Sequence, residues 1–224
     1  MKLKDMNCVV TGATGGTGPA IVEYLSQKCA AVVGVVRGEN GRWSNLGGSR
    51  FQINANILDP KSVERLISEV VKHLKSIHVW INVVGGFAMG KNVEDTESED
   101  WRGMYNLNFN SVLNCCRQIL PIFKAQHFGR IINFGSVAGL EGMGLAGSYA
   151  VSKAAVINLT KTVSLEGKDY GITANVIIPD IIDTSANRKA MPEADFSQWT
   201  TPIQIAEKIV TLIDSVRTGE TIRV

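Results

Sequence analysis

The sequence has little of what metal-binding, disulfide-rich or membrane-spanning proteins need. Its 224 residues include only three histidines and four cysteines, and none of these has metal-ligand spacing. Cys115 and Cys116 are adjacent and the other two lie in apolar surroundings, which indicates reduced core thiols rather than a disulfide framework. The longest apolar run, Ala30–Val36, is interrupted by Gly34 and is too short to span a membrane. We therefore expect a cytoplasmic protein without a structural metal.

A strong charge of one sign is also missing. The 23 basic and 21 acidic residues leave a net charge of +2, which does not favour binding to nucleic acid or to a membrane surface. The short apolar stretch Cys8–Val10 does not fit a secretory leader. Apolar residues make up 45% of the chain, enough for an extensive core. No linker or repeat divides the sequence, so we expect one domain over residues 1–224 that carries both dinucleotide binding and catalysis.

What the sequence does contain is a regular alternation of short apolar runs with segments of helical period. The expected strands are Asn7–Thr11, Ala31–Val36, Arg50–Ile53, Val79–Val84, Gly129–Phe134, Thr173–Ile178 and Thr221–Val224. The expected helices are Pro19–Lys28, Pro60–Leu74, Glu97–Gln126, Tyr149–Glu166 and Pro202–Ser215. The strand runs are mostly apolar throughout, as in strands that helices cover on both faces. The pattern predicts an α/β fold, a Rossmann-type doubly wound parallel sheet of about seven strands.

A glycine-rich turn, Thr11–Gly18 (TGATGGTG), joins the first strand to the first helix. Gly12 permits the tight turn, Gly16 lets the backbone approach a pyrophosphate, and Gly18 allows close packing of helix on strand. The following helix directs its N–H groups and its positive dipole end at that phosphate. An ordinary glycine-rich loop is the alternative, but this placement favours a dinucleotide site. Its expected contacts are Gly12, Thr14, Gly15, Gly16, Thr17 and Gly18.

The residues that follow the second strand bear on which dinucleotide is bound. NAD sites commonly place an acid there to hold the ribose hydroxyls, and Val36 cannot do this. The next residue is Arg37, whose guanidinium can pair with a 2′-phosphate. An ordinary exposed loop arginine is the alternative. We expect NADP as the cofactor, with NAD as the second choice.

Tyr149 and Lys153 stand one helical turn apart on an expected helix. A phenol titrates near pH 10 in isolation, and a nearby ammonium together with a cationic nicotinamide is expected to lower that pKa. Ser136 follows the end of the expected strand Gly129–Phe134, where a doubly wound sheet opens its site, and can hydrogen-bond a substrate oxygen. A surface Tyr–Lys pair is the alternative, but the serine favours a proton-transfer site.

These segments resemble those of the short-chain dehydrogenase/reductase family. Gly129–Gly139 (GRIINFGSVAG), followed by Tyr149–Lys153 (YAVSK), is similar to the family's Ser, Tyr and Lys segments with matching spacing, and the glycine turn has the family's spacing too. The resemblance covers essentially the whole chain. It implies Asn108 as a further catalytic residue that kinks a helix and holds a proton-relay water. The implied catalytic set is Asn108, Ser136, Tyr149 and Lys153.

The resemblance also extends the cofactor site. Asn82–Gly85 (NVVG) is similar to the family's segment beside the adenosine ribose, and Pro179–Thr184 to its segment around the nicotinamide carboxamide. Val83 and Asp180 depart from the family pattern, and Asn56 replaces an aspartate that commonly meets the adenine. The contacts implied beyond the turn and Arg37 are Asn56, Ile57, Asn82, Val84, Gly85, Tyr149, Lys153, Pro179, Ile182 and Thr184.

The function implied is hydride transfer between a nicotinamide and a small carbonyl compound or its alcohol, with Tyr149 as general acid and base, Ser136 orienting the substrate and Lys153 holding the ribose. The candidate substrate-pocket residues, each otherwise explained by ordinary packing, are Phe87, Met89, Met143, Leu145, Phe196 and Trp199. Relatives imply a homo-oligomer, a tetramer or a dimer.

Two other functions stay open. Gly85–Gly90 and Asn187–Trp199 resemble segments of dihydropteridine reductases, which makes pterin-type imine reduction an alternative. Those enzymes lack the serine that Ser136 supplies here and carry an acid after the second strand, so carbonyl chemistry comes first. The second alternative is a dinucleotide-sensing protein without catalysis, because a fold does not fix a function.

Overall fold

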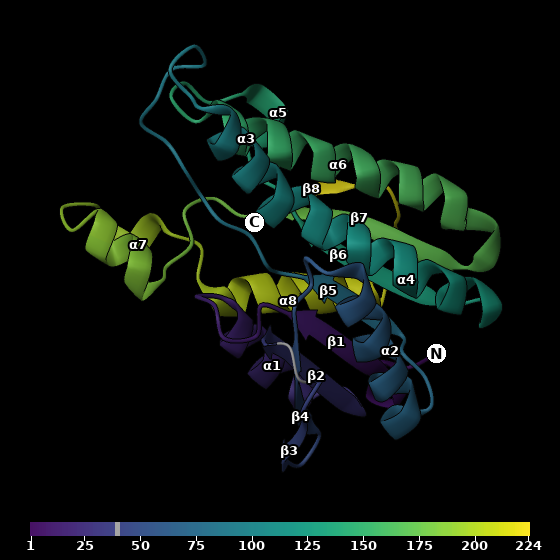
Figure 1. The fold of residues 1–224 in the computed structure, drawn as a ribbon. Helices are drawn as coiled ribbons and strands as arrows, with labels where there is room; N and C mark the ends of the chain where they lie inside the picture. Colours follow the sequence, from purple (N-terminus) through teal and green to yellow (C-terminus); the bar gives the residue numbers. More distant parts are fainter. Residues whose placement is uncertain (39–40) are drawn as a thin grey trace.

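The computed structural model describes residues 1–38 and 41–224, which form a sheet with helices on both of its faces (Figure 1). The sheet has eight strands in the order β3-β4-β2-β1-β5-β6-β7-β8. The strands are β1 (Asn7–Thr11), β2 (Ala31–Arg37), β3 (Trp43–Gly47), β4 (Arg50–Ala55), β5 (Val79–Asn82), β6 (Gly129–Phe134), β7 (Ile172–Ile178) and β8 (Thr221–Arg223). All neighbouring strands are parallel except β3 and β4.

The helices divide between the two faces of the sheet. They are α1 (Gly18–Ser26), α2 (Pro60–Leu74), α3 (Ser98–Tyr105), α4 (Ser111–Ala125), α5 (Ala138–Glu141), α6 (Gly147–Gly167), α7 (Ser185–Ala190) and α8 (Pro202–Ile213), with 3₁₀ turns at Leu3–Asp5, Lys168–Tyr170 and Phe196–Gln198. On one face α2, α4 and α6 cover a core that includes Trp80 and Phe123. On the other, α1 and α8 enclose a second core around Ile21 and Ile209.

The helix starts follow from local sequence signals. The Asp59 side chain accepts hydrogen bonds from the backbone N–H groups of Lys61 and Ser62, and so caps α2. Thr201 and Gln204 form a reciprocal capping box at the start of α8. Both helices carry proline in the first turn, where the missing N–H is not needed.

The strand order creates the opening for a site. From β1 the chain builds outward through β2 and β4 in one direction and through β5, β6 and β7 in the other. The loops that leave the carboxyl ends of β1 and β5 therefore diverge, and doubly wound sheets bind ligands in the crevice between such loops.

Besides the short helices α5 and α7, which the sequence did not predict, two features differ from the sequence-based expectation. The sheet has an eighth strand, β3, which pairs antiparallel with β4 and contains a register shift between Asn45 and Gly47. The expected helix Glu97–Gln126 is not continuous, because a π-helical turn, Asn106–Asn110, separates α3 from α4. The other expected elements are present, with ends that differ by at most two residues.

Candidate active site

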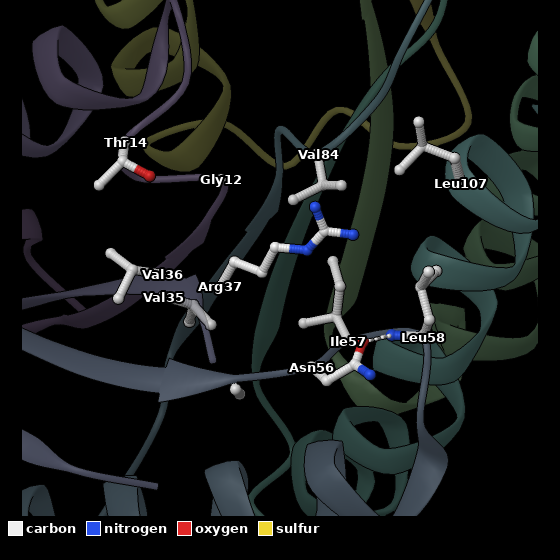
Figure 2. A pocket seen from close by; sticks show the side chains of 11 residues that line it. Gly12, Thr14, Val35, Val36, Arg37, Asn56, Ile57, Leu58, Val84 and Leu107 are labelled. Atoms are coloured by element: carbon white, nitrogen blue, oxygen red, sulfur yellow. Dashed lines mark hydrogen bonds between the residues drawn. The ribbon is translucent and has the colours of Figure 1, made fainter. Parts of the chain in front are cut away.

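A cleft of about 260 Å³ opens at the carboxyl ends of the strands on the β1 side of the sheet. Figure 2 shows its lining residues, which come from the glycine turn, the ends of β2 and β4, the segments after β4 and β5, and the π-helical turn. The lining residues are Gly12, Thr14, Val35, Val36, Arg37, Ala55, Asn56, Ile57, Leu58, Val84 and Leu107. Apolar side chains dominate this lining, and the Arg37 guanidinium supplies its positive charge. The combination suits an aromatic base with a phosphate beside it.

The glycine turn forms one wall, and its glycines fit the expected roles. Gly12 has a φ of +69°, a left-handed conformation that favours glycine. A Cβ on Gly18 would lie 2.1 Å from the Gly12 carbonyl oxygen, so only glycine fits there. A Cβ on Gly16 would lie 2.9 Å from the Thr184 side chain, which places Thr184 directly beside the turn. Thr14 and Gly15 are exposed at its tip, whereas Thr17 is buried.

Arg37 is the last residue of β2, and its exposed side chain extends across the cleft toward Val84 (Figure 2). Asn56 follows β4, and its amide oxygen accepts a hydrogen bond from the Leu58 N–H at 3.1 Å. The Asn56 amide nitrogen is then the group available to a bound base. Ile57 is buried beside it.

The family resemblance implies a cofactor contact for Asn82, but its side chain does not line the cleft. It is 2% exposed and belongs to a buried network beneath the cleft. Its amide oxygen accepts from the Trp80 indole N–H at 2.9 Å, and its amide nitrogen donates to Asn133 Oδ1 at 2.8 Å. Asn133 in turn donates to Thr160 on α6. Asn82 therefore ties strands and helix together, and Val84 rather than Asn82 lines the cleft.

The structure brings Ser136, Tyr149 and Lys153 together where β6 ends and α6 begins. The Ser136 hydroxyl interacts with the Tyr149 phenol. Lys153 is 6% exposed, and its ammonium donates to the Phe134 carbonyl oxygen at 2.9 Å. A Cβ on Gly85 would lie 3.2 Å from Lys153 Nζ, so the segment after β5 passes over the lysine. Three separate elements thus meet at one point.

Burial sets the proton affinities of this group. Desolvation raises the pKa of Tyr149 above its ordinary value, and the hydrogen bond with Ser136 opposes that rise. Desolvation lowers the pKa of Lys153 to about 8. The sequence predicted a lowered tyrosine pKa, and this is wrong for the protein alone because burial outweighs the effect of the hydrogen bond with Ser136. At neutral pH the phenol is therefore protonated, which is the form that can donate a proton.

Asn108 is fully buried in the π-helical turn, at the interruption that the family resemblance implied. Its amide oxygen accepts from the Gly86 N–H at 2.8 Å, and its amide nitrogen donates to the Gly86 carbonyl and to Ser152 Oγ. Ser152 donates to the Tyr149 carbonyl oxygen at 2.7 Å. Asn108 thereby links the segment after β5 to the helix that carries the tyrosine.

The segment after β7 returns over the glycine turn. Pro179 is half-buried, and Ile182 forms a parallel bridge with Thr200. Thr184 caps α7 by accepting from the Asn187 N–H and touches the turn at Gly16. This segment is therefore positioned to close the far end of a dinucleotide site that begins at the cleft.

The candidate substrate-pocket residues differ in how far they are exposed. Phe87, Met89, Met143 and Leu145 are exposed, and the Phe87 ring meets the Tyr149 ring edge-on with centroids 4.9 Å apart. Trp199 is 7% exposed and packs against Phe196 with ring centroids 4.7 Å apart, and its place in a substrate pocket stays a prediction.

Sequence reasoning missed part of the cleft. The residues that it did not name are Val35, Ala55, Leu58 and Leu107. They are ordinary apolar residues in the sequence, and only the packing of β2, β4 and the π-helical turn brings them together. A hydrophobic residue directly beside Asn108 was the one available signal for Leu107.

The described residues, 1–38 and 41–224, include no group of three or more His, Cys, Asp or Glu side chains arranged to hold a metal ion. Within the same ranges, no helix is both long and apolar enough to cross a membrane.

Comparison with known proteins agrees with this geometry. The sequence pattern of the short chain dehydrogenase family matches residues 6–195. The 3-oxoacyl-[acyl-carrier-protein] reductase of Escherichia coli is 30% identical over 191 residues, 84% of this chain and 78% of that protein. A 3beta-hydroxysteroid dehydrogenase of Mediterraneibacter gnavus is 30% identical over 219 residues, 95% and 79% of the two chains. The structure of ElxO with NADP bound is 24% identical and superposes with a TM-score of 0.88 over 100% of this chain and 97% of that one, which is a likeness of fold.

Proposed function

The chain belongs to the short-chain dehydrogenase family, and we propose that it reduces a small carbonyl compound with NADPH, using Tyr149 to deliver the proton. It is an NAD(P)-dependent oxidoreductase that acts between C=O and CH–OH groups. One observation supports this mechanism best: Ser136, Tyr149 and Lys153 lie together where β6 ends and α6 begins.

The side chains divide the work of proton transfer. When bound, the nicotinamide supplies hydride to the carbonyl carbon or accepts it from the alcohol. The neutral Tyr149 phenol then donates its proton to the oxygen, while the Ser136 hydroxyl holds that oxygen in place. In this proposal Lys153 binds ribose hydroxyls and stabilises the phenolate that forms. Asn108 holds Gly86 and Ser152 in position beside these catalytic side chains through its hydrogen bonds.

The cleft fits NADP, and two observations support that choice. Arg37 places a guanidinium at the end of β2, where a 2′-phosphate needs a cation, and Val36 offers no acid for a free ribose hydroxyl. ElxO, which has this fold, binds NADP in its solved structure. The glycine turn suits the pyrophosphate, since Gly16 leaves its backbone uncovered by a side chain and Gly18 lets the first turn of α1 pack against Gly12.

Carbonyl reduction is preferred over pterin-type imine reduction because of Ser136. Two relatives act on 3-oxoacyl and 3beta-hydroxysteroid groups, both of which are carbonyl–alcohol pairs. The serine that polarises a carbonyl oxygen contacts the tyrosine here. Faster reduction of a quinonoid dihydropterin with NADH than of any carbonyl compound would reverse this order.

The test is turnover by Tyr149→Phe. Purified wild-type protein should oxidise NADPH in the presence of members of a broad ketone and aldehyde panel. The variant should lose about 100- to 10,000-fold in kcat, because the phenolic proton is gone while the ring remains. Tyr24→Phe, on α1 away from the site, is the matched control and should retain activity. Undiminished turnover by Tyr149→Phe would refute the mechanism, and dinucleotide binding without turnover on any substrate would favour a sensor.

We also infer a cytoplasmic homo-oligomer, a tetramer or a dimer. The four cysteines are buried free thiols, the state that a reducing compartment maintains. Ile119 and Val156 pack into this chain's own core, but Leu165 on α6 is 76% exposed and could meet a second copy. Light scattering in solution gives the number of subunits.

A further inference from the structure

Two loops beside Tyr149 are joined to each other. The Gly90 N–H donates to the Leu145 carbonyl oxygen at 2.8 Å, and Lys91 forms a parallel bridge with Ala146. The loops, with Leu140 of the adjoining helix α5, expose large apolar side chains, which we call the apolar mouth: Phe87 (56% exposed), Met89 (58%), Leu140 (45%), Met143 (43%) and Leu145 (47%). Exposed apolar side chains that cluster in this way commonly mark a binding surface.

The apolar mouth is continuous with the reacting group. Phe87 meets Tyr149 edge-to-face, with ring centroids 4.9 Å apart and an interplanar angle of 81°. A substrate whose oxygen reaches the Tyr149 hydroxyl therefore lies close to the Phe87 ring. The occupant that this contact selects is the part of the substrate next to the carbonyl, rather than a separate protein partner.

The backbone of the apolar mouth is held in a costly conformation. Leu145 has a φ of +60°, which is uncommon for a residue other than glycine, asparagine or aspartate. A glycine there would relieve the strain, yet the chain presents a leucine. Strain of this kind concentrates at functional sites, where the side chain is needed in that place.

The charged groups on the same loops are paired with neighbours. Lys91 forms an ion pair with Asp100 at 2.8 Å, and Glu141 pairs with Arg223. Methionine adds adaptability, because its unbranched, flexible side chain conforms to varied apolar shapes. The surface next to the tyrosine therefore offers hydrocarbon contact with its nearby charges already satisfied.

We propose that the apolar mouth binds a hydrocarbon chain attached to the substrate carbonyl, so that the substrate class is an alkyl carbonyl compound of at least several carbons. This inference rests on the proposed function, since Tyr149 must act on the carbonyl at the head of that chain. The chain lies along Phe87, Met89, Met143 and Leu145, and each added methylene removes further apolar surface from water.

Binding and turnover together test the proposal. In the presence of NADPH, calorimetry with propanamide, butanamide, pentanamide and hexanamide measures binding of carbonyl compounds too unreactive for hydride transfer. The dissociation constant should fall about twofold to fourfold per methylene. The corresponding straight-chain methyl ketones should show a similar rise in kcat/KM. Affinity that does not depend on chain length overturns the proposal.

Variants locate the contact. Leu145→Gly relieves the positive φ, so its unfolding midpoint should stay the same or rise. Both Leu145→Gly and Met143→Ser should reduce the gain in affinity and in kcat/KM for each added methylene. Val216→Ser, at an 85% exposed position elsewhere, is the control and should keep the full gain. An unchanged gain in both mouth variants overturns the proposal. Amide binding that depends on chain length, without turnover of any ketone, would support the apolar mouth and refute the proposed function. Ketone turnover that does not depend on chain length would support the proposed function and refute the apolar mouth.

Discussion

At the scale of single residues, burial controls the chemistry of the site. Lys153 lies inside the protein, where its charge is poorly solvated, and Tyr149 lies beside it with a neutral phenol. The identities of these residues could be predicted from spacing, because i and i+4 share a helix face. Their pKa values could not be predicted from the sequence, because the degree of burial depends on how β6 and the segment after β5 pack over α6.

Lys153 predicts a dependence of stability on pH. The folded pKa is about 8, below the unfolded value near 10.4, so between these values the unfolded chain binds more protons at this residue. Stability should therefore rise as pH increases from about 8 to about 10.5, by about 3 kcal/mol from this group. Urea unfolding at pH 7.5 and pH 10 should show a smaller rise for Lys153→Met than for wild type, and equal rises would contradict the assignment.

Arg37 predicts cofactor preference. Arg37→Ser should raise the KM for NADPH about 10- to 100-fold, because a charge-assisted contact with the 2′-phosphate is lost. The KM for NADH, which lacks that phosphate, should change little. Steady-state kinetics with both dinucleotides decide the matter, with Arg117→Ser on α4 as the control for removing an exposed arginine. A parallel loss with NADPH and NADH would show that Arg37 does not bind the 2′-phosphate.

At the scale of elements, the glycine turn depends on close approach of backbone to backbone. A Cβ on Gly18 would come within 2.1 Å of the Gly12 oxygen and 2.8 Å of Ala13 Cα, and both atoms belong to the backbone. A Cβ on Gly15 meets the same oxygen at 3.4 Å, an ordinary contact. The turn therefore requires glycine at position 18 for steric reasons, whereas at position 15 it has room for a larger residue.

Gly18→Ala should destabilise the fold by about 1–3 kcal/mol and weaken dinucleotide binding, because the turn must shift to admit the methyl group. Gly15→Ala should change the free energy of unfolding by less than about 0.5 kcal/mol. Chemical denaturation and fluorescence titration with NADPH measure both effects. Equal stability of the two variants would indicate that the turn is looser than the structure shows.

The elements show where sequence patterns succeed. β1 and β6 were predicted with their observed ends, because continuous apolar runs identify strands covered on both faces. β3 was missed, because its sequence, WSNLG, has neither an apolar run nor alternation and forms a strand only by pairing with β4. The π-helical turn was likewise invisible to helical periodicity, although the family resemblance at Asn108 implied a kink.

At the scale of the whole molecule, the two cores on either side of the sheet enclose every cysteine. Burial raises the pKa of Cys115, and it raises that of Cys116 to about 12. A hydrogen bond to Cys29, 3.4 Å away, and burial raise the pKa of Cys8. Burial protects all four thiols sterically, and the raised pKa values of Cys8, Cys115 and Cys116 also keep those three thiols out of the reactive thiolate form.

A thiol-reactive dye should therefore label the native protein slowly and incompletely, and all four thiols should react once the chain is unfolded in guanidinium chloride. The absorbance of the released chromophore counts the reacted thiols in each state. Rapid reaction of one or more thiols under native conditions would mean that a core opens readily.

The antiparallel strand β3 also has a consequence for how copies of the protein behave in a crowded solution. Without β3, the outer edge of β4 would present unpaired N–H and C=O groups to any passing strand. β3 occupies that edge, and its own exposed outer border is short, polar at Ser44 and Asn45, and irregular at the register shift. Such an edge is a poor template for another chain, which protects the molecule against edge-to-edge aggregation.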